Sequence, residues 1–486
     1  MIKQLLFVTF VTLIAYLGIF RNQFVIDDHV FIGPYHPNFV QSFMGSVPPG
    51  HEGVYRPLRG VLYTLYHHLW ATNIYLYHLH SLLIHLISTF LVYFIVKKIA
   101  INWQLTTKYL PFITAMLFGL HPVHTETITY ITSSMDSLGL VFYLLAFYLY
   151  LNNKLVRSLI FTALAFFTTE MTLTLPIIIL YHDWIFQKLT RGKVPYYLTS
   201  FGLVGLYATI RFLLLDITTR GPYLAQSFYL TMLTMTRVLL KYLQVLLWPF
   251  NLSSNHIIAP GIEAFVYRNY RVAAIAAQSI LDLEILLPLT VIIIIIFLVI
   301  RLKPRFPLIS FSLGWIFLTL LPVMEFVPQG SMMNERSLYL ASIGYLILLA
   351  LFVLQIWNQR TNLGVLTLIV IALLYLNQTI SRNRDWLNDI TIWQADISQN
   401  PKDNAYAYYS LGNAWNDRRD YLKAVDAYAE AVKINPGMAV GWASLGRTYN
   451  DLGDTTSAIK FYEHALTLDP NFWEVRHNLN NIYSRL

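Results

Sequence analysis

The sequence contains no cysteine, which excludes disulfide bonds, thiolate zinc sites and cysteine nucleophiles. Charge is also scarce, because only 12% of the 486 residues are charged, against about 25% in soluble domains. Residues 379–486 nevertheless hold 24 charged side chains, or 22%, whereas residues 1–378 hold only 9.5%. Hydrophobic residues make up 56% of the chain, and the mean hydropathy is +0.51. We therefore predict a polytopic membrane body over 1–378 and a soluble domain over 379–486.

The net charge of +8 divides into +10 for the body and −2 for the tail. A basic excess in a membrane body reflects topology, because short cytoplasmic loops collect lysine and arginine, so no nucleic-acid partner is predicted. The apolar stretch after Lys3 ends at Arg21-Asn22-Gln23 without a small-residue cleavage site. We expect this stretch to remain as an uncleaved first span.

Eleven apolar runs are long enough, with their flanking residues, to cross a bilayer. They are 4–20, 76–96, 109–122, 137–151, 155–168, 171–186, 195–214, 284–302, 306–322, 339–357 and 361–378. A further run, 231–248, carries Arg237, Lys241 and Gln244 at near-helical spacing, which favours an amphipathic helix at the membrane interface. Eleven spans place the basic loops on the side of Lys3 and the tail on the opposite, extracytoplasmic side.

On this topology four longer loops share the outer face with the tail. The predicted outer loops are 21–75, 122–136, 215–283 and 323–338. The inner loops are short and basic, so any chemistry is expected on the outer face.

The tail repeats with a period of 34 residues. The matched positions are Tyr408, Leu411, Gly412, Trp415, Ala424, Tyr428, Ala431 and Pro436, followed by Trp442, Leu445, Gly446, Tyr449, Ala458, Tyr462, Ala465 and Pro470. This is the tetratricopeptide pattern, which predicts repeats at 405–438 and 439–472, a degenerate half repeat at 386–401 and a partial cap at 473–486. Such arrays bind polypeptide on a concave surface, with Tyr408, Trp415, Trp442 and Tyr449 as candidate contacts. The alternative is a structural cap without a ligand.

The first outer loop opens with Asp27-Asp28, directly after the first span. Two adjacent carboxylates at a membrane surface are costly to desolvate, which indicates a general base or a metal ligand, the alternative being a solvated helix cap. Arg56 and Arg59 follow in the same loop and have the geometry to grip a phosphate, although interfacial anchoring is the competing interpretation.

The second outer loop contains His121, His124 and Glu126 and ends at Asp136. Pro122 breaks the helix that an HExxH-type zinc site requires, so no dedicated metal site is predicted.

Two further charged positions stand at the outer ends of spans. Glu170 lies in a tight turn after Thr169, where a carboxylate can simply cap a helix. Glu335 and Arg336 precede a span, where they can form a mutual salt bridge. The predicted topology brings these charged residues from several loops to one face of the membrane. This convergence favours a functional site over separate structural roles.

These segments together resemble the transmembrane-and-tetratricopeptide (TMTC-like) O-mannosyltransferases, membrane glycosyltransferases with the GT-C fold. The resemblance covers nearly the whole chain. It is carried by Asp27-Asp28, Tyr55-Arg56-Pro57-Leu58, His121-Pro122-Val123-His124-Thr125-Glu126, Leu247-Trp248-Pro249-Phe250-Asn251-Leu252-Ser253, Asn334-Glu335-Arg336-Ser337-Leu338-Tyr339 and the C-terminal repeats. The chain departs from the family pattern at Thr169-Glu170, where relatives often carry a lysine before the glutamate, and in its small number of repeats.

The resemblance implies an all-α fold, a GT-C-like bundle of about 11 spans followed by a tetratricopeptide solenoid. It also implies transfer of mannose or another hexose from a polyprenyl-phosphate donor to serine or threonine hydroxyls of an acceptor protein held by the repeats. An acidic residue of the first outer loop acts on the acceptor in such enzymes. The absence of long insertions suggests a prokaryotic plasma-membrane protein.

On this interpretation the candidate residues take three roles. The catalytic candidates are Asp27, Asp28 and Glu126, with Asp27 or Asp28 as the base of a single inverting displacement. The candidates for binding the donor phosphate are Arg56, Arg59, Arg336, His121 and His124, because fixed cations stabilise developing charge. Further candidates are Glu335, Glu170 and Asp136. No cofactor is required, since arginines can do the electrostatic work of a metal, and a divalent cation remains compatible.

Two other functions stay open. A GT-C enzyme can glycosylate a lipid or a glycan instead of a protein. A transporter or scaffold with a docking tail is the non-enzymatic alternative, although transporters place ionisable groups near the middle of the membrane.

Overall fold

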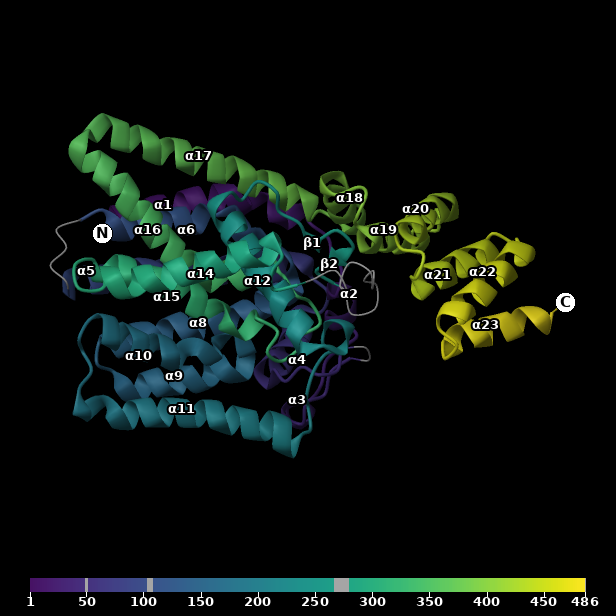
Figure 1. Cartoon of the computed structure of the whole chain (residues 1–486), viewed down its shortest axis with the longest axis horizontal. Helices are drawn as coiled ribbons and strands as arrows, with labels where there is room; N and C mark the ends of the chain where they lie inside the picture. The colour runs from purple at the N-terminus through teal and green to yellow at the C-terminus, as the bar shows by residue number, and fades with distance from the viewer. Residues whose placement is uncertain (49–50, 103–107, 266–278, 486) are drawn as a thin grey trace.

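The computed structural model describes residues 1–48, 51–102, 108–265 and 279–485. Parts of the predicted outer loops 21–75 and 215–283, and the last residue of the cap, therefore lie outside the described residues. Within these ranges the chain is predominantly helical, and the single sheet found there is an antiparallel hairpin of β1 (Ile257–Ala259) and β2 (Ile262–Glu263). The predicted fold class is confirmed: a helical bundle is followed by a helical repeat domain (Figure 1).

The bundle is built from long apolar helices joined by short helical turns. Its main helices are α1 (Ile2–Tyr16), α4 (Pro57–Trp70), α5 (Ile74–Asn102), α6 (Leu110–Leu120), α8 (Ile131–Leu151), α9 (Leu155–Thr168), α10 (Leu175–Ile185), α11 (Val194–Ala208), α12 (Phe228–Leu247), α14 (Leu283–Leu302), α15 (Pro307–Leu320), α16 (Leu338–Gln359) and α17 (Thr361–Asp385). The short helices α2 (Asp28–Phe31), α3 (Phe39–Phe43) and α7 (Thr125–Thr129) lie in the connections.

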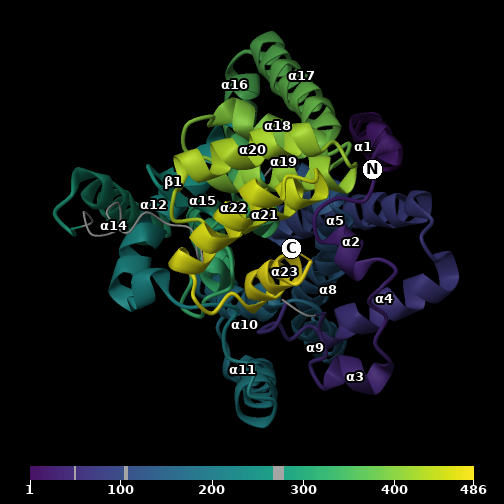
Figure 2. The same cartoon turned by 90° about the vertical axis from the view of Figure 1, so that its right-hand side faces the viewer.

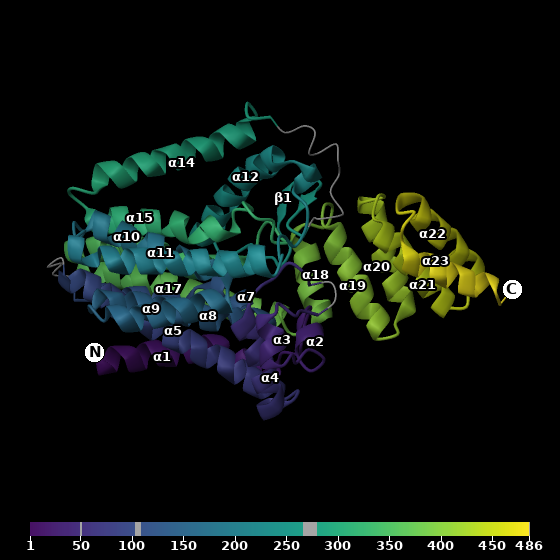
Figure 3. The ribbon, with the colours of Figure 1, turned by 90° about the horizontal axis from the view of Figure 1, so that it is seen from below.

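Each of the eleven predicted spans coincides with one of these helices. By length and composition, eight helices of the described residues can cross a membrane, and α6, α9 and α15 are shorter apolar helices. The chain is thus a multi-pass membrane protein. The core lies around α8 and α16, where 72% of the apolar window is buried, whereas in α14 only 11% is buried. An apolar helix with so little protein around it is suited to contact lipid, and α14 lies at the margin of the bundle (Figure 3).

Helix α12 is the additional candidate span. Its middle is joined to the start of α14 by a salt bridge of 3.0 Å between Arg237 and Glu284. Near its end the Tyr242 hydroxyl accepts a hydrogen bond from the backbone N–H of Asn334, in the fourth outer loop. Both contacts lie at the end of the bundle that carries the outer loops, which suits a helix lying across that end. The orientation of α12 in a membrane stays a prediction.

The repeat domain continues the chain beyond α17. It consists of α18 (Asp389–Gln399), α19 (Ala405–Asp417), α20 (Tyr421–Ile434), α21 (Ala439–Asp451), α22 (Thr455–Leu468) and α23 (Trp473–Tyr483). The two glycines of the repeat pattern explain the tight packing within each pair. A Cβ atom at Gly412 would lie 2.5 Å from the Tyr428 ring, and one at Gly446 would lie 2.7 Å from the Tyr462 ring. Both positions therefore require the smallest side chain.

The repeat domain lies against one end of the bundle (Figure 2), and buried polar contacts join the two. Glu263 lies in β2, opposite Ile257 of β1. Its carboxylate accepts the backbone N–H groups of Ala405 and Tyr406 at 3.1 and 3.0 Å. Both N–H groups belong to the first turn of α19, where backbone N–H groups have no acceptor within the helix. Burial raises the pKa of Glu263 to about 7.

A second contact joins α18 to the same loop. The buried Asp396 carboxylate accepts the N–H groups of Ser254 and Asn255, each at 3.1 Å, and also the Ser254 hydroxyl. Because buried carboxylates are retained only when they are well hydrogen-bonded, these contacts fix the first repeat helices on the outer loops.

Candidate active site

A cavity of about 270 Å³ lies at the junction of the bundle and the repeat domain. Residues of all four outer loops and of the first repeat helices line it, among them Ile26, Asp27, His51, Arg56, Glu126, Tyr130, Arg220, Ser254, Asn334, Arg336, Trp386, Trp393 and Tyr406. Segments separated by more than 300 residues in the sequence thus form one concave site, the usual shape of a small-molecule pocket.

The aspartate pair is divided by the structure. Asp27 lines the cavity, and no donor among the described residues lies within hydrogen-bonding distance of its carboxylate. Asp28 is fully buried, and its carboxylate accepts the Thr132 N–H and hydroxyl, both at 2.7 Å, and the Val25 N–H at 3.2 Å. Burial raises the pKa of Asp28 to about 7. Asp28 therefore ties the first loop to the start of α8, whereas Asp27 lines the cavity.

We expect Asp28→Ala to lower the unfolding temperature of the purified protein. The variant leaves the Thr132 and Val25 donors buried without an acceptor, at a cost of about 1–3 kcal/mol each. Thermal unfolding in detergent, followed by tryptophan fluorescence, measures the change. Asp451→Ala, which removes an exposed carboxylate, is the control. An unchanged unfolding temperature together with lost activity would instead assign Asp28 a chemical role.

The two arginines of the first loop are already paired. Arg56 donates from Nε and NH2 to Glu170 at 2.6 and 2.7 Å, and from NH1 to Asp136 at 2.5 Å. Arg59 donates to the same Asp136 at 3.2 Å. Two cations and two carboxylates give a cluster with no net charge. Although burial acts against it, the Arg56 guanidinium holds the pKa of Glu170 well below its usual range.

Glu126 and Arg336 form a second pair in the cavity wall. Glu126 accepts the backbone N–H of Arg336 at 3.1 Å and its guanidinium at 3.2 Å. Burial raises the pKa of Glu126, while the nearby Arg336 opposes the rise. The Arg336 side chain remains 21% exposed, and only one of its guanidinium nitrogens is bonded to Glu126, so the others can reach a ligand.

Arg220 is a lining cation that sequence reasoning did not select. Within the described ranges no carboxylate lies at salt-bridge distance from it, and its one side-chain hydrogen bond there is to His51 Nδ1 at 3.5 Å. Burial lowers the pKa values of both Arg220 and His51. A half-buried cation that faces a cavity without a counter-ion is a strong candidate for binding an anion. No motif surrounds Arg220 in the sequence, so only the structure identifies it.

His121, His124 and Glu335 do not line the cavity. His124 is buried against α16, with Nε2 at 2.9 Å from the Ser342 hydroxyl. His121 accepts the Val123 N–H and so caps the short turn that Pro122 starts. Glu335 is buried and accepts the Ser253 N–H at 2.6 Å. Among the described residues no group of three histidine, aspartate or glutamate side chains could hold a metal ion.

Aromatic side chains of the repeat domain form the far wall of the cavity. Trp386 stacks on Tyr130 of the second outer loop, with ring centroids 5.6 Å apart and an interplanar angle of 16°. Trp393 meets Tyr406 edge to face at 5.7 Å. The indole N–H of Trp386 is buried without a hydrogen-bond partner in the described structure. The wall thus presents aromatic surface to the cavity, which suits packing against a ring such as a sugar.

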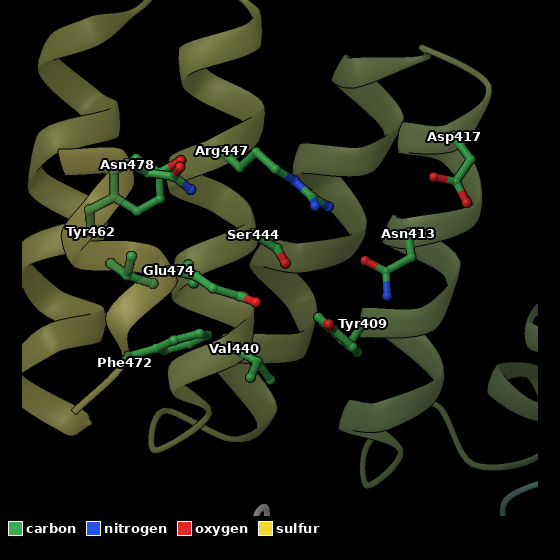
Figure 4. Close-up of a pocket in the computed structure, with 12 residues that line it drawn as sticks. Tyr409, Asn413, Asp417, Val440, Ser444, Arg447, Tyr462, Phe472, Glu474 and Asn478 are labelled. Atoms are coloured by element: carbon green, nitrogen blue, oxygen red, sulfur yellow. The ribbon is translucent and has the colours of Figure 1, made fainter. Parts of the chain in front are cut away.

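The repeat domain has a groove of its own, with a volume of about 470 Å³, between α19, α21 and α23 (Figure 4). Its lining includes Tyr409, Asn413, Asp417, Val440, Arg447, Tyr462, Phe472 and Glu474. The four predicted contact residues, Tyr408, Trp415, Trp442 and Tyr449, are half-buried and do not line it. The repeat signature marks residues that pack helices together, as Trp442 does against Phe461, so the signature does not identify the groove.

Comparisons with known proteins agree with this architecture. A tetratricopeptide repeat family model matches residues 439–472. The chain is 26% identical to Protein O-mannosyl-transferase F38B6.6 of Caenorhabditis elegans over 90% of this chain and 63% of that protein. It is 24% identical to mouse TMTC3 and 23% identical to human TMTC3, both named protein O-mannosyl-transferases, over 79% of this chain and 44% and 45% of those proteins. The chain spans about half to just under two thirds of the length of these relatives. Through most of its length the chain is therefore similar to protein O-mannosyl-transferases, and it carries a tetratricopeptide repeat near its C-terminus.

Proposed function

We propose that the chain is a membrane glycosyltransferase that moves a hexose, such as mannose, from a polyprenyl-phosphate donor to serine or threonine hydroxyls of extracytoplasmic proteins. The names of the relatives support transfer to protein. The observation that carries the proposal is the cavity in which Asp27, without a partner among the described residues, shares a wall with Arg220 and Arg336. A base and fixed cations in one enclosed site are what transfer from a sugar phosphate requires.

Asp27 is the proposed base. Its carboxylate takes the proton of the acceptor hydroxyl while the hydroxyl oxygen attacks the anomeric carbon. The bond from that carbon to the phosphate oxygen breaks, the lipid phosphate leaves with the bonding electrons, and the configuration of the sugar inverts.

Arg220 and Arg336 are the proposed partners of the donor phosphate. The leaving phosphate gains negative charge in the transition state, and fixed cations aimed at that charge lower the barrier. Arg56 and Arg59 are not proposed to bind the phosphate, because their charges are neutralised by Asp136 and Glu170. They stiffen the cavity wall next to the phosphate. No metal is needed for these steps, and a divalent ion remains compatible with them.

The groove of the repeat domain is the proposed binding site for the acceptor protein. Its lining joins apolar side chains such as Phe472 to the charges of Asp417, Arg447 and Glu474, a mixture suited to an extended polypeptide (Figure 4). Holding the acceptor there raises its concentration near the cavity.

We expect Arg447→Ala to raise the KM for a protein acceptor about 3- to 10-fold, because truncating an arginine in a binding groove removes about 1 kcal/mol or more. The kcat should stay unchanged, and a short peptide that cannot span groove and cavity should react as before. Steady-state transfer kinetics with both acceptors measure this. Arg418→Ala removes an exposed arginine that does not line the groove and is the control. Equal KM values for the two variants would place acceptor binding elsewhere.

The test of the proposed function is transfer of radiolabelled hexose from a polyprenyl-phosphate donor in membranes that contain the protein and a serine- and threonine-rich acceptor. Label in base-labile, protein-bound sugar supports the proposal. Label in extractable lipid instead would keep the enzyme class and change the acceptor. No transfer from either mannosyl or glucosyl donors would reject the proposal.

A further inference from the structure

The loop that carries Asp27 is held by the repeat domain as well as by the bundle. Asp389, the first residue of α18, accepts the backbone N–H of Ile26 with Oδ1 at 2.8 Å. Its other oxygen, Oδ2, lies 2.9 Å from His29 Nε2. The Asp389 carboxylate thus contacts Ile26, just before the aspartate pair, and His29, just after it. Asp389 and His29 are 360 residues apart in the sequence.

Asp389 is free for these contacts because another residue caps its helix. The Asn388 side chain accepts the N–H groups of Ile390 and Thr391, which are the first donors of α18. Asp389 therefore does not serve its own helix end. The hydrogen bond to Asp389 raises the pKa of His29.

The residue that Asp389 holds has an unfavourable backbone conformation. Ile26 has a φ of +53°, in the left-handed region that β-branched residues rarely enter. Such a conformation is energetically unfavourable and persists only when the surroundings enforce it. Without the bond to Asp389, the Ile26 N–H loses its acceptor, and the turn that carries Asp27 is held only by the contacts of Val25 and Asp28.

We propose that Asp389 is a positioning residue, which fixes the Ile26 turn so that Asp27 points into the cavity, and that the first repeat helix is thereby part of the catalytic site. This inference rests on the proposed function. It differs from acceptor docking, because the contribution of α18 does not depend on which acceptor is used. Trp393 of α18 and Tyr406 of α19 line the same cavity as Asp27. The repeat domain therefore supplies both a wall of the cavity and the support for the proposed base.

The test compares Asp389→Ala, Asp389→Asn and Asp454→Ala in the full chain, with a short peptide acceptor that does not depend on the groove. Asparagine keeps an oxygen for the Ile26 N–H. Asp454→Ala removes a carboxylate at the start of α22 and so loses a helix cap far from Asp27. We expect Asp389→Ala to lower kcat about 10- to 100-fold with the donor KM within about threefold, because small misplacements of a catalytic group are costly. Asp389→Asn should keep at least about a third of the wild-type kcat, and Asp454→Ala all of it.

Hydrogen exchange provides a readout that does not need activity. The peptide covering Phe24–Phe31 should exchange faster in Asp389→Ala than in the wild type, and at the wild-type rate in Asp389→Asn and Asp454→Ala. An unchanged kcat in Asp389→Ala, an equal loss in Asp454→Ala, or a loss of the same size in Asp389→Asn would each overturn the inference. Failure of the proposed function is a separate result, because it would appear as absence of transfer in the wild type, while exchange would still decide whether Asp389 holds the loop.

Discussion

Asp27→Asn should lower the kcat of sugar transfer by about 10²- to 10⁴-fold, the range that a positioned general base contributes. The substitution keeps the size of the side chain and removes its ability to take a proton. Because no hydrogen bond to the Asp27 carboxylate is present in the described structure, the change should leave the unfolding temperature within about 1 °C of the wild type. Initial rates with saturating donor and peptide acceptor measure the effect.

The matched control for this variant is Asp216→Asn. Asp216 is an exposed aspartate of the third outer loop that does not line the cavity, and its φ of +50° is one that asparagine tolerates well. Its kcat should equal that of the wild type. If Asp27→Asn transfers sugar at the normal rate, the base must be another group, with Glu126 the remaining carboxylate in the lining.

Arg220→Ala should lower kcat/KM for the donor by about 10²- to 10³-fold. The reason is electrostatic: a fixed cation facing a leaving phosphate in an enclosed site stabilises the transition state by several kcal/mol. Unlike Arg56 and Arg59, Arg220 has no carboxylate at salt-bridge distance among the described residues, so its charge is available to the phosphate. Arg220→Lys keeps the charge but loses the planar fork, so an intermediate loss of about tenfold is expected.

Inhibition by the product, polyprenyl phosphate, tests whether Arg220→Ala weakens binding of the phosphate rather than another step. Polyprenyl phosphate should inhibit the wild type competitively against the donor, and about 10-fold or more weakly in Arg220→Ala. Arg384→Ala removes an exposed arginine at the end of α17, outside the cavity lining, and should leave the inhibition constant unchanged. Equal inhibition constants for Arg220→Ala and the wild type would show that the phosphate binds elsewhere.

The fold was largely predictable because its signals are local. Apolar runs fix the helices of the bundle, and a 34-residue period fixes the repeats. The sequence did not decide whether α12 spans the membrane or lies at its interface. The helix is long and apolar enough to span, yet it carries Arg237. Its contacts, which decide how it lies on the bundle, involve Glu284 and Asn334, and no local pattern reports such distant partners.

The site was predictable only in part, because ion pairing depends on tertiary contacts. The sequence marks Arg56 and Arg59 as cations, but Asp136 and Glu170, which neutralise them, come from other helices. The sequence also treats Asp27 and Asp28 as equivalent. Their difference arises from a turn at Ile26 that points one carboxylate at Thr132 and leaves the other facing the cavity.

The aromatic wall of Trp386, Trp393 and Tyr406 has a consequence for the order of events during synthesis. These residues follow α17, the last helix of the bundle, so the ribosome makes them after every span has been produced. Chains fold from the N-terminus as they are made. The aromatic wall of the cavity is consequently added last, and a nascent or truncated bundle still lacks that side of the cavity. If the proposed function holds, synthesis of residues 386–406, rather than insertion of the bundle, is the step that completes the site.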